Sequence, residues 1–434
     1  MSEPREKDAG LKAAATDAQK TRKRVLSGMR PTGRLHIGHY FGALQNWVKL
    51  QEQFDCFYFV ADWHALTTDY ADASQLARNT IEIGTDWLAA GLDPNKCTLF
   101  IQSAVPEHAE LHLMLSMVTP LGWLERVPTY KEQLGQITDK DLHTYGFLGY
   151  PLLQTADIVI YDAHFVPVGE DQVPHVEMSR EVVRKFNFHY GLVIDDDIFS
   201  DEKRPYLKQE EIWGKLPSGL IERPNQPYSD IQKAEIKAFV ARMVQEYGVG
   251  NLHHHIANDL ISSIRQQHVL TEPEVLLTET PRIPGTDGRK MSKSYDNYIN
   301  LSESDDAIRE KTRNMLTDPA RKRRTDPGNP DVCPVFSWHK LFSPKESIEQ
   351  VNQECRTAEI GCVDCKKMMA ENLVKWIEPI RARRQEYEAH PQRVLEILEE
   401  GSKKARAVAQ GTMRRVREAI FDWKKLRSEI GVVE

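Results

Sequence analysis

The stretch VLSGMRPTGRLHIGHYFGALQNWVKL, residues 25–50, decides the fold of this chain. It starts with a short apolar run, continues through the chain-breaking residues Gly28, Pro31 and Gly33, and ends in a helical pattern of apolar residues over 35–50. A strand, a glycine-containing loop and a helix in this order are typical of the start of a doubly wound α/β sheet. In such sheets ligands bind at the carboxyl ends of the strands, where the loops lie.

The next elements continue the alternation of strand and helix. Continuous apolar runs at 57–61 and 98–102 predict strands, and the patterns over 74–90 and 108–118 predict helices. Strands without polar alternation, separated by helices, indicate a parallel sheet that is covered on both faces. We therefore expect a Rossmann-like α/β domain built on a parallel sheet.

The remaining sequence predicts further parts. Mixed polar, helix-prone sequence interrupts the strand order after residue 190, and the pattern is helical from Asp305 onward. We expect five segments: a disordered tail (1–22), the first part of the α/β domain (23–190), an inserted subdomain (191–271), a return to the α/β domain (272–304) and a C-terminal all-helical domain (305–434).

The composition argues against several classes of protein. The chain has 57 Lys and Arg against 64 Asp and Glu, a net charge of −7. No apolar run approaches the ~18 residues that a membrane span needs. Six cysteines without a secretory signal favour the reducing cytoplasm over a disulfide framework. We expect a cytoplasmic protein that does not contact a membrane.

The charge is unevenly distributed along the chain. Residues 366–434 carry 16 Lys and Arg and 11 Asp and Glu, a net charge of +5, whereas residues 1–365 have a net charge of −12. A basic end on an acidic body suggests a local contact with a polyanion, although a basic helix can also be a solvated face.

The sharpest motif lies between the first predicted strand and its helix. His36 and His39 are three residues apart, so on a helix they share a face and can point at one ligand. Gly38 has no side chain, so a flat base can approach its backbone. The start of the helix adds a partial positive charge that suits a phosphate. The alternative interpretation is a pair of surface histidines on an amphipathic helix.

A second motif strengthens the functional interpretation. Lys290, Met291, Ser292, Lys293 and Ser294 form a loop that can close on a pyrophosphate, whose developing charge the lysines would balance. By itself this segment could be a solvated basic loop. Together, HIGH (36–39) and KMSKS (290–294), in this order on an α/β domain, resemble the two signatures of class I aminoacyl-tRNA synthetases.

Within that class the chain resembles the bacterial tryptophanyl-tRNA synthetases, from about residue 25 to 190 and again from about 272 onward. The segment YPLLQTADI (150–158) is similar to the helix that lines the amino-acid pocket of this family, and VPVGEDQ (166–172) is similar to its strand and turn. The resemblance implies that Asp157 accepts the indole N–H and that Tyr150 and Gln172 hold the substrate ammonium. The chain departs from the family at Gln154, often Met, and at Leu26, often Phe.

The resemblance also implies a set of site residues. Tryptophan-binding residues would be His64, Tyr150, Gln154, Asp157, Val168 and Gln172. ATP-binding residues would be Arg30, Pro31, Thr32, Gly38, His39, Gly169, Glu170, Asp171, Ile283, Lys290, Met291, Ser292, Lys293 and Ser294. The catalytic electrostatics would come from His36, His39, Lys290 and Lys293.

Four of the cysteines form a separate pattern. Cys333, Cys355, Cys362 and Cys365 are separated by 21, 6 and 2 residues, and four thiolates can hold zinc or an iron–sulfur cluster. The pattern resembles that of a [4Fe–4S]-bearing subset of the family, shortened by one residue in its first gap. We expect one [4Fe–4S] cluster, with Zn²⁺ as the alternative. The basic run 321–324 beside it is expected to contact tRNA phosphates.

The resemblance implies a tryptophan–tRNA ligase. Such an enzyme activates L-tryptophan with Mg²⁺ and ATP to the adenylate and transfers the tryptophanyl group to tRNA(Trp), and the resemblance implies a homodimer. Two alternatives stay open at this point. Tyrosine-specific synthetases share both signatures, and a non-catalytic RNA-binding iron–sulfur paralogue could reuse the same scaffold.

Overall fold

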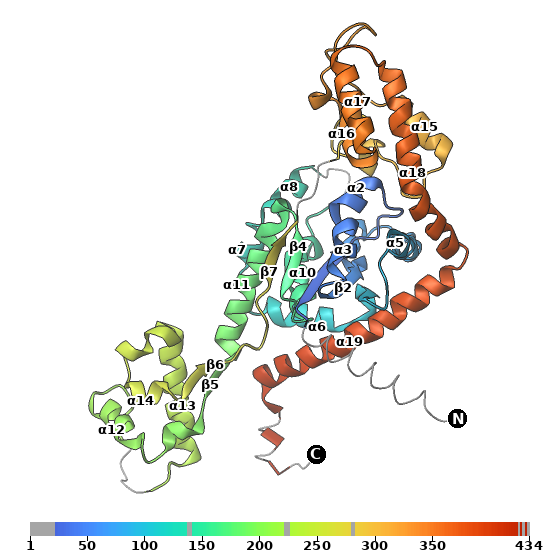
Figure 1. Ribbon diagram of the computed structural model, residues 1–434. Helices are drawn as coiled ribbons and strands as arrows, with labels where there is room; N and C mark the ends of the chain where they lie inside the picture. The colour runs from blue at the N-terminus through green and yellow to red at the C-terminus, as the bar shows by residue number, and fades with distance from the viewer. Residues whose placement is uncertain are drawn as a thin grey trace, which may run out of the picture.

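The computed structural model describes residues 22–136, 141–220, 226–278, 283–423, 426–427 and 430–431. The expected disordered tail, apart from Arg22, lies outside the described residues. In Figure 1 the described chain forms a central sheet with covering helices, a separate lobe at one end and a helical tip at the other. No described helix combines the length and the apolar character that crossing a membrane requires.

The central sheet has five parallel strands in the order β3-β2-β1-β4-β7, which confirms the predicted fold class. Its strands are β1 Arg24–Met29, β2 Asp55–Val60, β3 Cys97–Ile101, β4 Phe165–Val168 and β7 Glu274–Leu277. Because the strands are parallel, the loops after β1, β2 and β4 leave the same edge of the sheet. Two hydrophobic clusters cover the two faces, one with Val25 and Tyr58 and the other with Leu26 and Phe57.

The helix predicted over 35–50 forms from Ile37 onward, and its middle part is π-helical rather than α-helical. It consists of α2 Ile37–His39, a π-helical turn Tyr40–Leu44 and α3 Gln45–Leu50. Leu35 and His36 are outside it because they pair with a later segment, through an isolated bridge between His36 and Asn300.

The helices that follow in the α/β domain are α4 Asp62–Asp69, α5 Leu76–Ala90, α6 Glu107–Ser116, α7 Leu121–Leu124, α8 Pro128–Gln136, α9 Tyr145–Leu148, α10 Tyr150–Val159 and α11 Val173–Tyr190, with 3₁₀ turns at Gln102–Ala104 and Glu170–Gln172.

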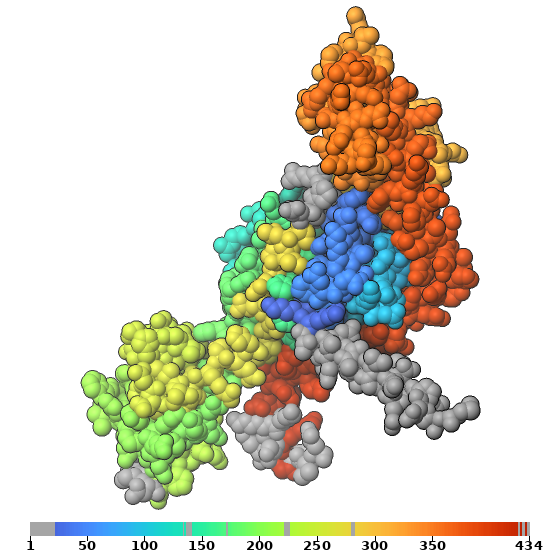
Figure 2. Space-filling model, viewed as in Figure 1, coloured from blue at the N-terminus to red at the C-terminus, as the bar shows by residue number. Residues whose placement is uncertain are grey.

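The segment between α11 and β7 forms a lobe with a hydrophobic core of its own. It contains an antiparallel pair, β5 Leu192–Ile194 and β6 Ile264–Gln266, at its junction with the rest of the molecule. Its helices are α12 Arg204–Ile212, α13 Asp230–Tyr247 and α14 Asn258–Ile261, with 3₁₀ turns at Asp196–Phe199 and Val249–His254. Figures 1 and 2 show this lobe standing away from the central sheet.

The C-terminal region is helical, as expected, and its last two helices pack against the α/β domain. The tip holds α15 Asp305–Arg313, α16 Pro334–Phe342, α17 Lys345–Arg356 and the start of α18 Cys362–Glu388, with a 3₁₀ turn at Pro330–Val332. A further 3₁₀ turn, Lys293–Tyr295, precedes the tip in the chain. In Figure 1, α18 runs down past α5, and α19 Pro391–Phe421 turns back across the sheet. The small residues of α19 explain this packing, because they let it approach the edge strand β3 closely.

The contact between α19 and β3 reaches the backbone of the strand. A Cβ atom on Gly401 would lie 1.8 Å from the carbonyl oxygen of Leu99. The Ser402 hydroxyl accepts a hydrogen bond from the Ile101 amide at 3.2 Å. The last long helix therefore covers a sheet edge that would otherwise present unpaired backbone groups.

Candidate active site

A cavity of about 400 Å³ opens at the carboxyl ends of β1, β2 and β4. All six residues predicted to bind tryptophan line it: His64, Tyr150, Gln154, Asp157, Val168 and Gln172. Apolar side chains, among them Phe59 and Ile158, form part of its wall. The structure thus brings together residues from α4, α10, β4 and the turn after β4.

Asp157 is the fully buried centre of a hydrogen-bond network at the bottom of this site. It accepts from His64 Nε2 at 2.8 Å, from His108 Nδ1 at 2.5 Å and from Gln102 Nε2 at 2.8 and 2.9 Å. Burial by itself would raise the pKa of Asp157, but His108 and His64 outweigh burial and hold this pKa well below its ordinary value. Asp157 is therefore ionised and accepts only.

Gln102 and His108 were missed by the sequence analysis, and both hold Asp157 in place. The Gln102 carbonyl oxygen accepts from the Trp63 amide at 3.1 Å, so its NH₂ group must face the carboxylate. His108, also fully buried, reaches the Tyr161 hydroxyl through Nε2 at 2.5 Å. Neither residue lies in a sequence motif, and only the fold brings them to Asp157.

The opposite side of the cavity is polar as well. The Thr129 hydroxyl lies 2.7 Å from the Tyr150 hydroxyl and 2.6 Å from His175 Nε2. Thr129 and His175, which the sequence analysis did not identify, both line the cavity. Thr129 therefore holds Tyr150 in position on α10, and Gln172, in the turn after β4, lines the same cavity.

The HIGH residues start the helix beside this cavity. His36 is extended and precedes α2, and its amide donates to His39 Nδ1 at 3.2 Å. The two rings lie 3.7 Å apart. Burial lowers the pKa of His36 to about 4 and that of His39 to about 3, with a further contribution from Lys293. Both rings are neutral at pH 7, so they offer hydrogen bonds and not positive charge.

Two glycines keep this region open. A Cβ on Gly38 would lie 2.9 Å from the His36 ring, and a Cβ on Gly28 would lie 2.5 Å from the Phe59 ring. Any side chain at either position would displace a residue of the site. In addition, His36 Nδ1 is buried and has no hydrogen-bond partner among the described residues. A buried polar atom of this kind is suited to a ligand.

The KMSKS loop contacts the HIGH loop through one of its two lysines. Lys293 Nζ donates to the Thr32 carbonyl oxygen at 2.7 Å, and burial lowers its pKa. Lys290 is exposed, and its backbone carbonyl is held by Asn297 at 3.1 Å. Ser292 caps the turn that follows by accepting from the Ser294 amide at 3.2 Å. The structure thus separates two lysines to which the motif gives the same role.

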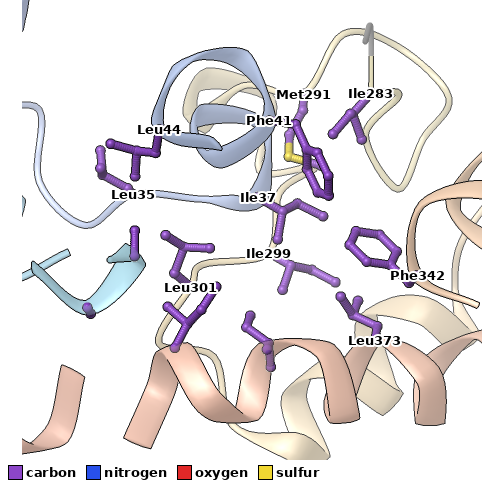
Figure 3. Close-up of a cluster of buried hydrophobic side chains, with 14 of the residues drawn as sticks. Leu35, Ile37, Phe41, Leu44, Ile283, Met291, Ile299, Leu301, Phe342 and Leu373 are labelled. Atoms are coloured by element: carbon purple, nitrogen blue, oxygen red, sulfur yellow. The ribbon is translucent and has the colours of Figure 1, made fainter. Parts of the chain in front are cut away.

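Two residues predicted to bind ATP have buried side chains in a hydrophobic cluster. Figure 3 shows Met291 and Ile283 directed toward Phe41, in a cluster that also contains Ile37 and Phe342. This cluster joins the KMSKS loop to the HIGH helix and to the helical tip. The side chains of Met291 and Ile283 hold the two signature loops against each other.

The other predicted ATP residues are spread around the mouth of the cavity. Arg30 lines it and donates to the His64 carbonyl and, at 2.8 Å, to the Thr67 hydroxyl. Pro31 is buried and Thr32 is exposed beside Lys293. Gly169 lines the cavity and Glu170 is exposed. The side chain of Asp171 lies outside the described part of the structure.

Cys333, Cys355, Cys362 and Cys365 lie near one another in the helical tip, and the other three affect the pKa of Cys365. Burial raises the pKa of Cys365 to about 12, with contributions from Cys333, Cys355 and Cys362. Four thiols fit an iron–sulfur cluster or zinc in kind and number. However, the part of the chain that the structure describes contains no group of three or more His, Cys, Asp or Glu side chains arranged to hold a metal ion. The metal site stays a prediction.

Two arginines of the basic run 321–324 bind the backbone between α17 and α18, beside these cysteines. Arg321 donates to the Ile360 carbonyl at 2.8 Å, and Arg324 donates to the carbonyl of Glu359 at 2.5 Å and to that of Ala358. Lys322 and Arg323 are exposed. Arg324 is exposed as well, and the contact of this run with tRNA phosphates stays a prediction.

Comparisons with known proteins agree with the motifs. The family of class I tRNA synthetases (W and Y) matches residues 18–238 and 251–378. Tryptophan–tRNA ligases from Ralstonia nicotianae and Thermotoga maritima are 49% and 44% identical, each over 92% of this chain and 98% of the relative. The structure of tryptophanyl-tRNA synthetase from Campylobacter jejuni, complexed with ADP and tryptophan, is similar with a TM-score of 0.68 and 28% identity over 92% of this chain and 99% of that one. The chain therefore belongs to the tryptophan–tRNA ligases, the bacterial tryptophanyl-tRNA synthetases of class I.

Proposed function

We propose that the cavity beside Asp157 holds the side chain of L-tryptophan. Asp157 is the only carboxylate among the described residues that line the cavity, and its surroundings keep it ionised. An ionised acceptor in a partly apolar pocket favours a flat ring with one N–H donor. Tyr150 and Gln172, which also line the cavity, would hold the ammonium group.

Indole binding requires Asp157 to give up or share one of its present hydrogen bonds. Of its three donors, only His64 lines the cavity; Gln102 and His108 lie behind it. We therefore assign His64 as the donor that gives way to the indole N–H. Gln102 and His108 keep the carboxylate in place during the exchange.

ATP would bind across the HIGH and KMSKS loops. Neutral His36 and His39 would hydrogen-bond to the phosphates, and the start of α2 would add its partial positive charge. The tryptophan carboxylate attacks the α-phosphate, an O–P bond forms, and the bond to pyrophosphate breaks. Lys293 would balance the charge on the departing pyrophosphate. No protein nucleophile is needed, so the protein works by positioning and electrostatics.

In the second step the tryptophanyl group passes from the adenylate to a terminal ribose hydroxyl of tRNA(Trp), and AMP leaves. The basic helices α18 and α19, with the exposed Lys322 and Arg323, are available for tRNA phosphates. We propose that both steps take place in the cytoplasm.

The observation that carries this proposal is the ionised Asp157 in a cavity next to the HIGH loop. It is tested by amino-acid-dependent exchange of pyrophosphate into ATP, with tryptophan and tyrosine compared side by side. Exchange with tryptophan, and much less with tyrosine, is expected. Equal exchange with both amino acids would show that Asp157 does not select the indole.

We further propose that Cys333, Cys355, Cys362 and Cys365 hold one [4Fe–4S] cluster. The support is their spacing and their proximity in the tip. Such a cluster would fasten the ends of α17 and α18 together, a structural role. Anaerobically purified protein should contain about four iron and four sulfide per chain, as the cluster formula requires. One zinc per chain, without sulfide, would replace the cluster with a four-thiolate zinc site.

A homodimer is the assembly that we propose. Leu113 on α6, Met117 directly after α6 and Leu121 on α7 are 51%, 69% and 58% exposed. An apolar surface of this kind suits a second copy of the chain. Sedimentation velocity should give a dimer for the parent chain and a monomer for Met117→Lys. A parent chain that sediments as a monomer at micromolar concentration would rule this assembly out.

A further inference from the structure

We propose that the buried pair Asp86–Arg384 is a positioning device for the HIGH loop, by which α18 sets the place of the ATP-binding residues. Asp86 lies on α5 and Arg384 near the end of α18, and each side chain is 1% exposed. Arg384 Nε donates to Asp86 Oδ1 at 2.6 Å. The inference rests on the proposed role of the HIGH loop in ATP binding.

The second oxygen of Asp86 reaches the HIGH loop directly. Asp86 Oδ2 accepts from the Leu35 amide at 2.7 Å, and Leu35 is the residue before His36. The Leu35 carbonyl oxygen accepts from the Leu301 amide at 2.9 Å. Leu35 is thus held on one side by the segment after KMSKS and on the other side by the carboxylate that Arg384 orients.

Two surface ion pairs of Arg34 also connect the HIGH loop to α5 and α18. Arg34, next to Leu35, pairs with Glu82 at 3.1 Å and with Glu388 at 2.7 Å. Arg384 also contacts Glu82 and Glu388. Two consecutive residues of the loop are therefore linked to the end of α18: Leu35 through Asp86 and Arg384 in the interior, and Arg34 directly through Glu388 at the surface.

A buried ion pair contributes little net free energy to folding, because the cost of removing both charges from water offsets their attraction. Replacing such a pair with apolar side chains is often neutral or stabilising, whereas a charged, directional pair fixes geometry. Here the geometry that it fixes is the backbone of Leu35. A small displacement at this point would move His36, Gly38 and His39 together, and misplacement by about 1 Å can cost about 10²-fold in rate.

Two double variants separate positioning from stability. Asp86→Leu/Arg384→Met removes both charges and the acceptor for the Leu35 amide. Asp86→Asn/Arg384→Met removes both charges but keeps an acceptor at residue 86. Arg381→Met is the matched control, since Arg381 lies one turn earlier on α18 and pairs with Asp305 at 2.6 Å without touching the HIGH loop.

The readouts are tryptophan-dependent pyrophosphate exchange per folded enzyme and transfer to tRNA from preformed tryptophanyl-adenylate. We expect Asp86→Leu/Arg384→Met to lower the kcat of exchange about 10²-fold, with KM for tryptophan and the transfer step unchanged. Asp86→Asn/Arg384→Met keeps an acceptor for the Leu35 amide but lacks the arginine that orients it, so it should recover only part of this loss. Arg381→Met should retain exchange close to that of the parent.

Equal exchange by the two double variants would overturn the positioning role, and so would a parallel loss of transfer, which indicates general disruption. Thermal unfolding of each variant gives the folded fraction by which rates are normalised. A parent enzyme without tryptophan-dependent exchange would instead refute the proposed function itself. The two failures are therefore distinguishable.

Discussion

Asp157 is held by donors from three different elements: His64 on α4, Gln102 after β3 and His108 on α6. A substitution at Asp157 therefore changes both the pocket and its support. Gln102 and His108, behind the cavity wall, keep the carboxylate in one orientation. This orientation determines from which side a ligand in the cavity can donate a hydrogen bond to it. At the scale of single residues, the orientation of Asp157 depends on side chains that do not themselves line the cavity.

Asp157→Asn should weaken tryptophan binding and reduce discrimination against tyrosine. An amide can still accept from the indole, but without the charge that strengthens the bond, and its NH₂ group would face other donors. We expect a loss of about 1–3 kcal/mol in the free energy of tryptophan binding, measured as KM in pyrophosphate exchange. Asp162→Asn is the control, because Asp162 pairs with Arg415 at the surface. Unchanged KM in Asp157→Asn would reassign Asp157 to a structural role.

The two signature lysines should differ in their effect on activation. Lys293 already lies against the HIGH loop, so Lys293→Ala should slow adenylate formation by about 10²–10³-fold, the usual cost of losing one such contact. Lys290 is exposed, and Lys290→Ala should cost less. Single-turnover formation of the adenylate measures both. Equal losses would mean that the loop rearranges when ATP binds and brings Lys290 to the phosphates.

Among the elements, α19 shows how a helix late in the chain completes an early sheet. Gly401 lets the helix axis approach β3, and Ser402 binds the strand through its hydroxyl. Alanine or a larger residue at 401 has no room, because the neighbouring atom is the Leu99 carbonyl of the strand itself. The whole helix would have to move.

Gly401→Ala should therefore destabilise the fold although alanine is the better helix former. Overpacking costs about 1–3 kcal/mol, which exceeds the gain of about 0.5–1 kcal/mol from removing a helical glycine. Gly411→Ala, on the same helix with nothing within 4 Å of its Cβ position, should stabilise by that gain. Urea unfolding measures both variants. A stabilised Gly401→Ala protein would show that α19 does not press on β3.

At the scale of the whole molecule, buried neutral histidines make stability depend on pH. His36 and His339 each have a pKa lowered to about 4 by burial, and His39 has a pKa lowered to about 3. In the unfolded chain a histidine takes up its proton near pH 6.5. Below this pH the unfolded state binds more protons than the folded state, so acid favours unfolding.

The free energy of unfolding should therefore fall as the pH decreases from about 6.5 toward 4, by up to about 1.4 kcal/mol per pH unit for each buried histidine. His39→Asn removes one of these titrating groups, so the free energy of unfolding should depend less steeply on pH. The fold should be retained, because the amide oxygen of Asn can replace Nδ1 as the acceptor for the His36 amide. Urea denaturation at a series of pH values tests this. Parallel slopes for parent and variant would contradict the assignment of His39 as buried and neutral.

Some of the site could be predicted from sequence and some could not. HIGH and KMSKS are contiguous motifs, so local spacing identifies them, and the resemblance located Asp157. Gln102, His108 and Asp86 carry no local pattern, because their partners are 55, 49 and 51 residues away along the chain. The path of α19 was also missed, since a helical pattern shows that a helix forms but not where it packs.

The covering of β3 by α19 has a consequence for synthesis of the protein. Ser402 follows Ile101 by 301 residues, so a ribosome completes the sheet edge long before it makes the helix that protects it. During that interval the nascent chain exposes an unpaired strand, a known starting point for aggregation. Chains that stop before residue 391 would keep this edge open permanently. We therefore expect the incomplete chain to aggregate more readily than the complete one, until the last helix has docked on the sheet edge.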